Sequence, residues 1–344
     1  MAQPLKPPRI KIDINTGRIK PPSPVVEEKE PKGHFPMLVF AGVVLSILAL
    51  TLSALLIFNK QPETSTYLEV VAHETLIFED RELRLPNQYF EKLQEPIAKS
   101  VIAESVLSYN PKTYQTYVER GANKKRQIAS ITKLMTAIVV KENFDLDSEI
   151  TIQKEYKELE WYVGFQKDDK IKVSELLKAM LVSSYNDAAM ILAENFPNEG
   201  FEGFIGKMNE IADLLGMEDS NFANPHGFDN KDNFSTANDI RKLVQLFITH
   251  QDLLEFTSSS SAELVYKEGS GLIKRMKIYT TNQFIGEYST VKGLKTGYTT
   301  SAGACLVAYF DAGDGDELVT IVLGAGDRFA DSRRLLEIVN ESYD

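Results

Sequence analysis

The chain has 344 residues, of which 43% are hydrophobic and 10% aromatic, so it is long enough to fold around a sizeable core. Its net charge of −11 argues against a nucleic-acid partner, because phosphate binding needs a basic surface. The single cysteine, Cys305, excludes an internal disulfide and a zinc site built on several thiolates, and its apolar neighbours predict a buried thiol. We expect no metal and no organic cofactor.

The N-terminal part contains an uncharged, mostly apolar stretch, residues 37–58. As a helix it would span about 33 Å, enough for a hydrocarbon core of about 30 Å. It is longer than the apolar region of a cleaved signal peptide, and no small-residue cleavage site follows it. The proline-rich residues 1–36 carry seven Lys/Arg and four Asp/Glu, and are predicted to be a disordered cytoplasmic tail. By the positive-inside rule, residues 37–58 form a single-pass signal anchor with the rest of the chain outside the cytoplasmic membrane.

The remaining chain is predicted to hold a polar linker, residues 59–95, and one α+β domain, residues 96–344. The predicted elements of this domain fall into three blocks. The first has two strands and a helix, the second has helices only, and the third has two strands and a final helix. The first block covers 101–108, 114–119 and 131–142; the middle helices cover 173–181, 187–194, 201–215 and 237–249; the last block covers 304–310, 318–323 and 331–339.

Three short motifs occur in order in this domain: Ser130-Ile131-Thr132-Lys133, Ser184-Tyr185-Asn186 and Lys295-Thr296-Gly297. Each is weak alone, since the first pattern recurs at residues 289–292 and the second at residues 108–110. We interpret these second copies as surface or turn residues. Only the first set places its serine at the start of a predicted helix, where residues i and i+3 are neighbours.

The spacing of Ser130 and Lys133 predicts a nucleophile with its base one helical turn away. The lysine must be neutral to take a proton, although its ordinary pKa is about 10.4. Burial and a second cation, for which Lys295 is the candidate, would lower that pKa. Ser184 is a candidate proton relay to the leaving amine, and Asn186 is a candidate to hold Lys133 and a substrate carbonyl.

The Lys295-Thr296-Gly297 segment suits an edge strand that pairs with an extended peptide. Gly297 is predicted to leave room for the substrate backbone. Lys295 and Thr296 supply a charge and a hydroxyl group for a carboxylate.

Residues 95–344 resemble the D-alanyl-D-alanine carboxypeptidases, a family of low-molecular-mass penicillin-binding proteins related to class A β-lactamases. The similarity extends beyond the triplets, to the segments 129–137, 184–189, 224–227 and 295–299. It implies a β-lactamase/transpeptidase-like α+β fold, an antiparallel sheet with helices on its faces and an inserted helical subdomain. It also implies a bacterial source and peptidoglycan as the substrate.

The resemblance implies that the chain removes the terminal D-Ala from peptidoglycan stem peptides through an acyl-enzyme on Ser130, and that β-lactams inhibit it covalently. The oxyanion hole would be the backbone N–H groups of Ser130 and Tyr298, with Thr299 in the substrate-binding segment. Arg328 falls where the family places an arginine near the substrate's terminal carboxylate. Residues 224–227, which include His226, are interpreted as a structural turn.

Three alternatives stay open. A D,D-endopeptidase that cleaves peptidoglycan cross-links would use the same residues. We expect neither the β-rich second domain nor the C-terminal anchor of many relatives in this chain, and this leaves the choice between the two reactions open. A class A-like β-lactamase is disfavoured, because no Glu-x-x-Leu-Asn stretch lies between Asn186 and Lys295. A non-catalytic scaffold that binds muropeptides is disfavoured by the three intact motifs.

Overall fold

A computed structural model describes residues 12–13, 18–19, 99–313 and 316–341 of the chain. The predicted membrane anchor and linker lie outside these residues, as does most of the predicted tail. No helix in the described part of the chain is both long enough and apolar enough to cross a membrane. The chain divides into two units, residues 1–70 and 71–344. In the first, β1 (Ile12–Asp13) and β2 (Arg18–Ile19) pair antiparallel.

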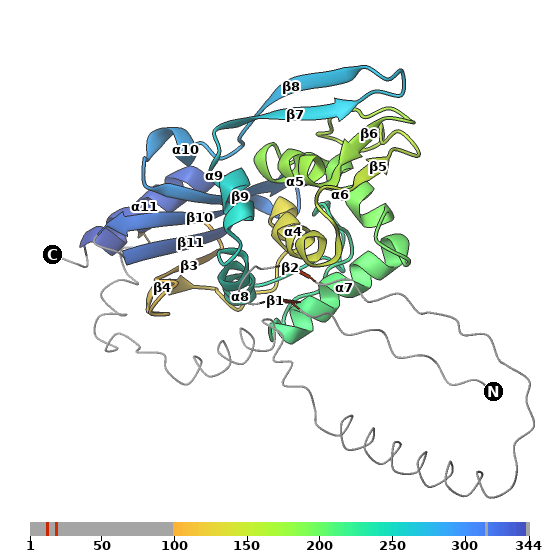
Figure 1. The fold of residues 1–344 in the computed structure, drawn as a ribbon. Coiled ribbons are helices and arrows are strands. Elements are labelled where there is room, and N and C mark those ends of the chain that lie inside the picture. Colours follow the sequence, from red (N-terminus) through yellow and green to blue (C-terminus); the bar gives the residue numbers. More distant parts are fainter. Residues whose placement is uncertain (1–11, 14–17, 20–98, 314–315, 342–344) are drawn as a thin grey trace, which may run out of the picture. The chain divides into compact units, whose positions relative to one another are not determined.

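A five-stranded antiparallel sheet lies at the centre of the second unit, in the order β4-β3-β11-β10-β9 (Figure 1). Its strands are β3 (Ser105–Tyr109), β4 (Thr116–Arg120), β9 (Val291–Thr299), β10 (Gly303–Gly313) and β11 (Asp316–Ala325). The two strands β10 and β11 are buried along most of their length, as expected for central strands with helices on both faces. The strand β9 lies at one edge of the sheet, as predicted for the segment that contains Lys295.

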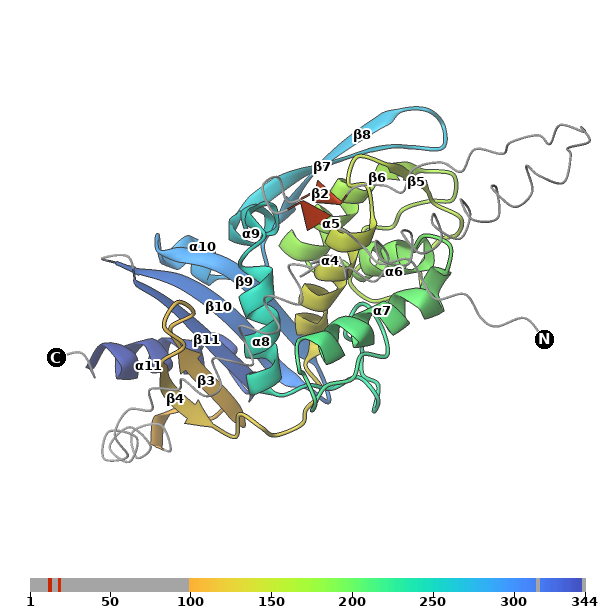
Figure 2. The same ribbon diagram turned by 60° about the horizontal axis from the view of Figure 1, so that its bottom comes forward.

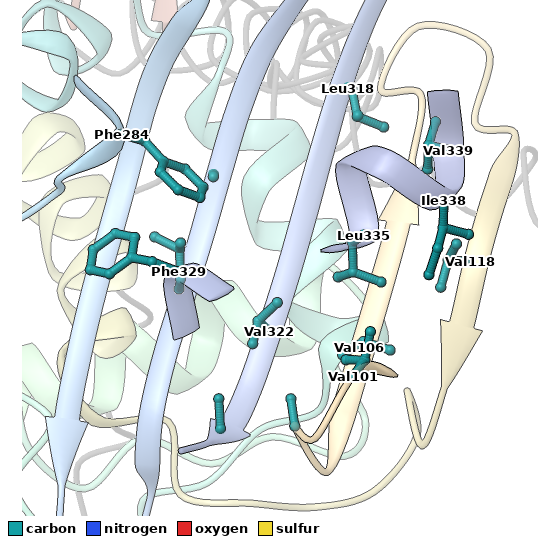
Figure 3. Close-up of a cluster of buried hydrophobic side chains, with 14 of the residues drawn as sticks. Val101, Val106, Val118, Phe284, Leu318, Val322, Phe329, Leu335, Ile338 and Val339 are labelled. Atoms are coloured by element: carbon teal, nitrogen blue, oxygen red, sulfur yellow. The ribbon is translucent and has the colours of Figure 1, made fainter. Parts of the chain in front are cut away.

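Helices cover both faces of this sheet (Figure 2). On one face lie α11 (Arg328–Glu341) and the short α10 (Phe284–Glu287), and on the other lies α8 (Ala237–Phe247). The apolar side chains of α11 and α10 pack on the sheet in one buried cluster, which includes Phe284, Val322 and Leu335 (Figure 3). Burial of this cluster fixes α11, and therefore Arg328 at its first turn, beside the sheet.

A helical region lies beside the sheet and surrounds α4 (Thr132–Asn143), which follows directly on the 3-10 helix η1 (Ala129–Ile131). Ten of the twelve residues of α4 are buried, so this helix is enclosed on every side. Its neighbours are α5 (Val173–Val182), α6 (Asn186–Glu194), α7 (Gly200–Leu214) and α8, while α9 (Gln251–Ser258) packs against α5 and β9. The helices predicted between residues 131 and 339 are all present within a few residues, and Ser130 lies where a helix begins, as predicted.

A second, four-stranded antiparallel sheet was not predicted. It has the order β5-β6-β7-β8 and consists of β5 (Glu149–Thr151), β6 (Lys170–Lys172), β7 (Ser261–Lys267) and β8 (Ile273–Tyr279). Two of these strands have three residues, and most of β8 is exposed, so none shows the long apolar pattern of the central sheet. The α+β prediction is confirmed, but it lacked this sheet.

Glu142, near the end of α4, is a buried carboxyl group whose ionisation should weaken the fold. Its side chain is 4% exposed, and its Oε2 has no hydrogen-bond partner among the described residues. Burial raises its pKa from 4.5 to about 7. Between these two values the unfolded chain loses the proton and the folded chain keeps it, so stability falls as the pH rises. We expect Glu142→Gln to stabilise the protein at pH 8 by at most about 3 kcal/mol, and to change little at pH 4.

Urea unfolding of both proteins across pH 4–8 measures this difference. The matched control is Glu149→Gln, because Glu149 is exposed on β5 and its replacement should change stability little at any pH. A stability difference for Glu142→Gln that stays flat with pH would contradict the assignment.

Candidate active site

Lys133 is buried in the first turn of α4, and three oxygen atoms surround its amine. Its Nζ lies 2.8 Å from Ser130 Oγ, 2.6 Å from Asn186 Oδ1 and 2.7 Å from the carbonyl oxygen of His226. The Asn186 amide is oriented by its other end, since Nδ2 donates to the carbonyl of Glu160 over 2.6 Å. A neutral amine has two N–H groups and one lone pair. The two carbonyl oxygens use the N–H groups, which leaves the lone pair for the hydroxyl of Ser130.

The surroundings of Lys133 favour this neutral form. Burial lowers the pKa of Lys133 well below 10.5, and the charge of Lys295 lowers it further, whereas Asp187 acts in the opposite direction. These are the two causes predicted from the sequence. The geometry and the charge state therefore both equip Lys133 to accept a proton from Ser130.

Lys295 forms a second pair with Ser184. Its Nζ donates to Ser184 Oγ over 2.8 Å and to the carbonyl of Thr296 over 2.9 Å. Burial and the neighbouring charge of Arg328 lower the pKa of Lys295 to about 7. Because Ser184 accepts this hydrogen bond, its own hydroxyl hydrogen stays available to another acceptor.

The segment 224–227 contributes a backbone group that was not predicted to take part. The carbonyl of His226 accepts the hydrogen bond from Lys133, and Ser130 Oγ lies 3.4 Å from the same oxygen. The imidazole does not reach these atoms; its Nδ1 accepts from the backbone N–H of Phe228 over 3.1 Å. Burial lowers the pKa of His226 to about 3, so the ring is neutral. The segment is a turn, as interpreted, but its carbonyl belongs to the site.

Two glycines allow the backbone around Ser130 to pack closely. A Cβ on Gly227, whose φ is +88°, would lie 1.9 Å from the carbonyl oxygen of Ala129. A Cβ on Gly297 would lie 2.7 Å from the backbone nitrogen of Ser130. The sequence predicted that Gly297 makes room for substrate. The structure gives a different reason, since its closest neighbours are atoms of the nucleophile segment itself.

We expect Gly227→Ala to destabilise the fold by about 2–4 kcal/mol, through its positive φ and its overlap with backbone atoms that cannot move aside. Urea unfolding measures the change. Gly206→Ala is the matched control, because Gly206 lies inside α7 with nothing near its Cβ position, and alanine there should be neutral or stabilising. Equal stability of the two variants would show that the turn tolerates a side chain.

The other predicted residues of β9 are gathered beside this centre. Thr296 Oγ1 lies 2.6 Å from Thr281 Oγ1, and Arg328 Nη1 donates to the carbonyl of Gly297 over 2.7 Å. Tyr298 follows Gly297, and its side chain is 68% exposed. Thr299 Oγ1 accepts from the backbone N–H of residue 302, so its hydroxyl holds the turn between β9 and β10. The structure thus brings all three motifs together, with Arg328 on the β9 side.

Residues 92–327 match the family model described as D-alanyl-D-alanine carboxypeptidase. The chain belongs to this family. It is 27% identical over 252 residues to the D-alanyl-D-alanine carboxypeptidase DacF of Bacillus subtilis (strain 168), which covers 70% of this chain and 63% of DacF. The D-alanyl-D-alanine endopeptidase of Escherichia coli (strain K12) is 33% identical over 195 residues, 53% of this chain and 58% of that protein. The chain therefore spans less than two thirds of the length of these two curated relatives.

Two solved structures share the fold of this family member. The Streptomyces K15 DD-transpeptidase has a TM-score of 0.64 and 27% identity, and the match covers 71% of this chain and 98% of that one. Penicillin-binding protein D2 from Listeria monocytogenes, in its cefotaxime-bound form, has a TM-score of 0.59 and 30% identity. The match covers 69% of this chain and 97% of that one. The predicted family and its antiparallel sheet with helices are confirmed.

Proposed function

We propose that the chain is a serine-type D-Ala-D-Ala carboxypeptidase that acts on peptidoglycan stem peptides. The observation that carries the proposal is the set of contacts around Lys133, in which only the serine hydroxyl is left to the lone pair of the amine. Membership of the family supports the same reaction. No step needs a cofactor.

In the proposed first step, Lys133 takes the proton of Ser130 while Oγ attacks the carbonyl carbon of the penultimate D-Ala. The negative charge that develops on the carbonyl oxygen faces the backbone N–H groups of Ser130 and Tyr298, which the close packing of Gly297 holds near each other. Ser184 relays the proton that Lys133 took up to the nitrogen of the terminal D-Ala as the C–N bond breaks, so Lys133 becomes neutral again and Ser184 keeps its hydroxyl group. Water then hydrolyses the ester and restores Ser130.

The substrate's terminal carboxylate is assigned to the β9 side of the site. Lys295, Thr296 and Arg328 supply two cations and a hydroxyl group there. The Arg328 guanidinium is fixed on this side because its Nη1 donates to the carbonyl of Gly297 over 2.7 Å. A β-lactam carboxylate would take the same place, and the Listeria relative, solved with cefotaxime bound, supports covalent inhibition of this chain by β-lactams.

We further propose that residues 37–58 anchor the protein in the bacterial cytoplasmic membrane as a single-pass helix, with the N-terminus inside. The support is the absence of charge in this stretch and the excess of Lys/Arg before it. The active site would then face the peptidoglycan.

The proposed reaction is tested by incubating the full chain with a stem pentapeptide and, separately, with a cross-linked muropeptide dimer. We expect release of D-alanine from the pentapeptide. Cleavage of the dimer with the pentapeptide left intact would instead establish the second candidate, a D,D-endopeptidase, which the E. coli relative supports. Inactivity on both substrates, without any penicillin adduct, would overturn both.

We expect Lys295→Gln to lower the rate of penicillin acylation by about a hundredfold near neutral pH, and to shift the acid limb of the pH–rate profile to higher pH. The reason is that the Lys295 charge lowers the pKa of Lys133, so its removal lets Lys133 hold its proton to higher pH. The deficit should therefore narrow as the pH rises.

The control is Lys295→Arg, which keeps the positive charge and should leave the acid limb near its wild-type position, even where the rate falls. Stopped-flow acylation from pH 5 to pH 10 measures all three proteins. An acid limb that is identical in the glutamine and arginine variants would disprove the electrostatic coupling.

A further inference from the structure

Two aromatic side chains lie next to the catalytic residues without a role in the mechanism above. Trp161 is 61% exposed, and its ring centroid lies 6.5 Å from that of Tyr185, with 30° between the planes. Tyr185 stands between Ser184 and Asn186 in the sequence. A large aromatic group left exposed beside a site is a candidate contact for ligand, because it offers much apolar area at little entropic cost.

Several hydrogen bonds fix Trp161 relative to the catalytic residues. Its carbonyl accepts from the backbone N–H of Asn186 over 3.0 Å, and its Nε1 donates to the carbonyl of Ser183 over 2.5 Å. The preceding carbonyl, of Glu160, holds the Asn186 side chain. The backbone of residues 160–161 therefore holds Asn186, while the ring of Trp161 is tied to the residue before Ser184.

The backbone on both sides of this contact adopts a conformation that side chains disfavour. Trp161 has a φ of +55° and Ser184 a φ of +63°. Residues other than glycine keep such angles only where the surrounding structure imposes them, and such positions concentrate at functional sites.

The charges around the ring favour a cationic ligand. Glu158 and Glu160 come three residues and one residue before Trp161 in the sequence and are exposed, and neither forms an ion pair with another described residue. An aromatic face attracts an ammonium group, and nearby carboxylates add to the attraction. The β9 side of the site carries positive charge instead, from Lys295 and Arg328.

We propose that Trp161 and Tyr185, with the carboxylates of Glu158 and Glu160, form a subsite for an amine-terminated side chain of the substrate, on the acyl-donor side of the scissile bond. The inference rests on the proposed function. A substrate with a carboxylate at one end and an amine on a preceding residue matches the two sides of the site. The subsite thus selects the stem peptides whose diamino acid keeps a free amine.

The test compares two peptides that end in D-Ala-D-Ala, one with a preceding lysine whose ε-amine is free and one in which that amine is acetylated. We expect the wild-type kcat/KM to be about fivefold higher for the free amine. The ratio should fall to about one in Trp161→Leu and in the double variant Glu158→Gln, Glu160→Gln. Leu272→Ala, at a similarly exposed apolar residue in the β7–β8 turn, should keep both the ratio and the rates.

A wild-type ratio near one, with both peptides hydrolysed, overturns the subsite while the proposed function stands. The same holds if Trp161→Leu slows both peptides by the same factor, because that result describes a positioning role alone. Failure of the wild type to hydrolyse either peptide or to form a penicillin adduct overturns the proposed function instead.

Discussion

Replacing Ser130 with alanine is expected to abolish the covalent penicillin adduct, which the wild-type chain should form once per molecule. Among the described residues, the substitution removes the only oxygen hydrogen-bonded to Lys133 that can give up a proton, since the other two acceptors are an amide oxygen and a peptide carbonyl. The loss of one hydroxyl leaves η1 and α4 otherwise intact. Intact-mass spectrometry of the full chain after penicillin treatment measures the adduct directly.

The sequence offers a matched control in its second Ser-x-x-Lys pattern. Ser289 is exposed and precedes β9, and Lys292 forms ion pairs with Asp311 and Glu317 at 3.3 Å each. The amine of Lys292 is held by these two carboxylates, and no hydrogen bond joins it to Ser289 among the described residues. We expect the Ser289→Ala variant to form the covalent penicillin adduct to the same extent as the wild type. An adduct on Ser130→Ala, or its loss in Ser289→Ala, would place the nucleophile elsewhere.

The site was predictable where its signal was local. A serine three residues before a lysine at the start of an apolar helix fixes one contact by helix geometry alone, and the structure shows it. The burial of α4 follows from its apolar middle, residues 134–140, and this burial lowers the pKa of Lys133. The pairing of Lys295 with Ser184 was not predicted, because 111 residues separate them in the sequence.

The rest could not be predicted, because it depends on backbone groups and on distant contacts. The carbonyls of His226 and Glu160 orient Lys133 and Asn186. Every residue has a backbone carbonyl, so the sequence does not indicate which of them will accept a hydrogen bond in the site. Ser108, in the second copy of the Ser-x-Asn pattern, was interpreted as a surface or turn residue, but it is buried in β3. A lone serine among apolar residues looks the same in either setting. The four-stranded sheet was missed because its strands are short or exposed.

Replacing Lys133 with arginine is expected to slow acylation of Ser130 by about a thousandfold, the scale of a lost general base. An arginine keeps the positive charge and most of the length of the side chain, but it is never neutral in a protein and so cannot accept a proton. It also lacks the compact geometry that lets one nitrogen meet three oxygens. Stopped-flow acylation by a fluorescent penicillin measures the rate.

Lys141→Arg, on the same helix, is the matched control, because Lys141 pairs with Asp252 and arginine can keep that ion pair. Its acylation rate should equal that of the wild type. Comparable acylation rates in Lys133→Arg and the wild type would mean that Lys133 is not the general base. The candidate base would then be Lys295, which has a pKa near 7 and contacts Ser184. In that event the remaining activity should rise with a midpoint near pH 7 and disappear when Ser184 is also replaced with alanine. If Lys133 is the base, Lys133→Arg has no such limb, because its arginine stays charged at every pH.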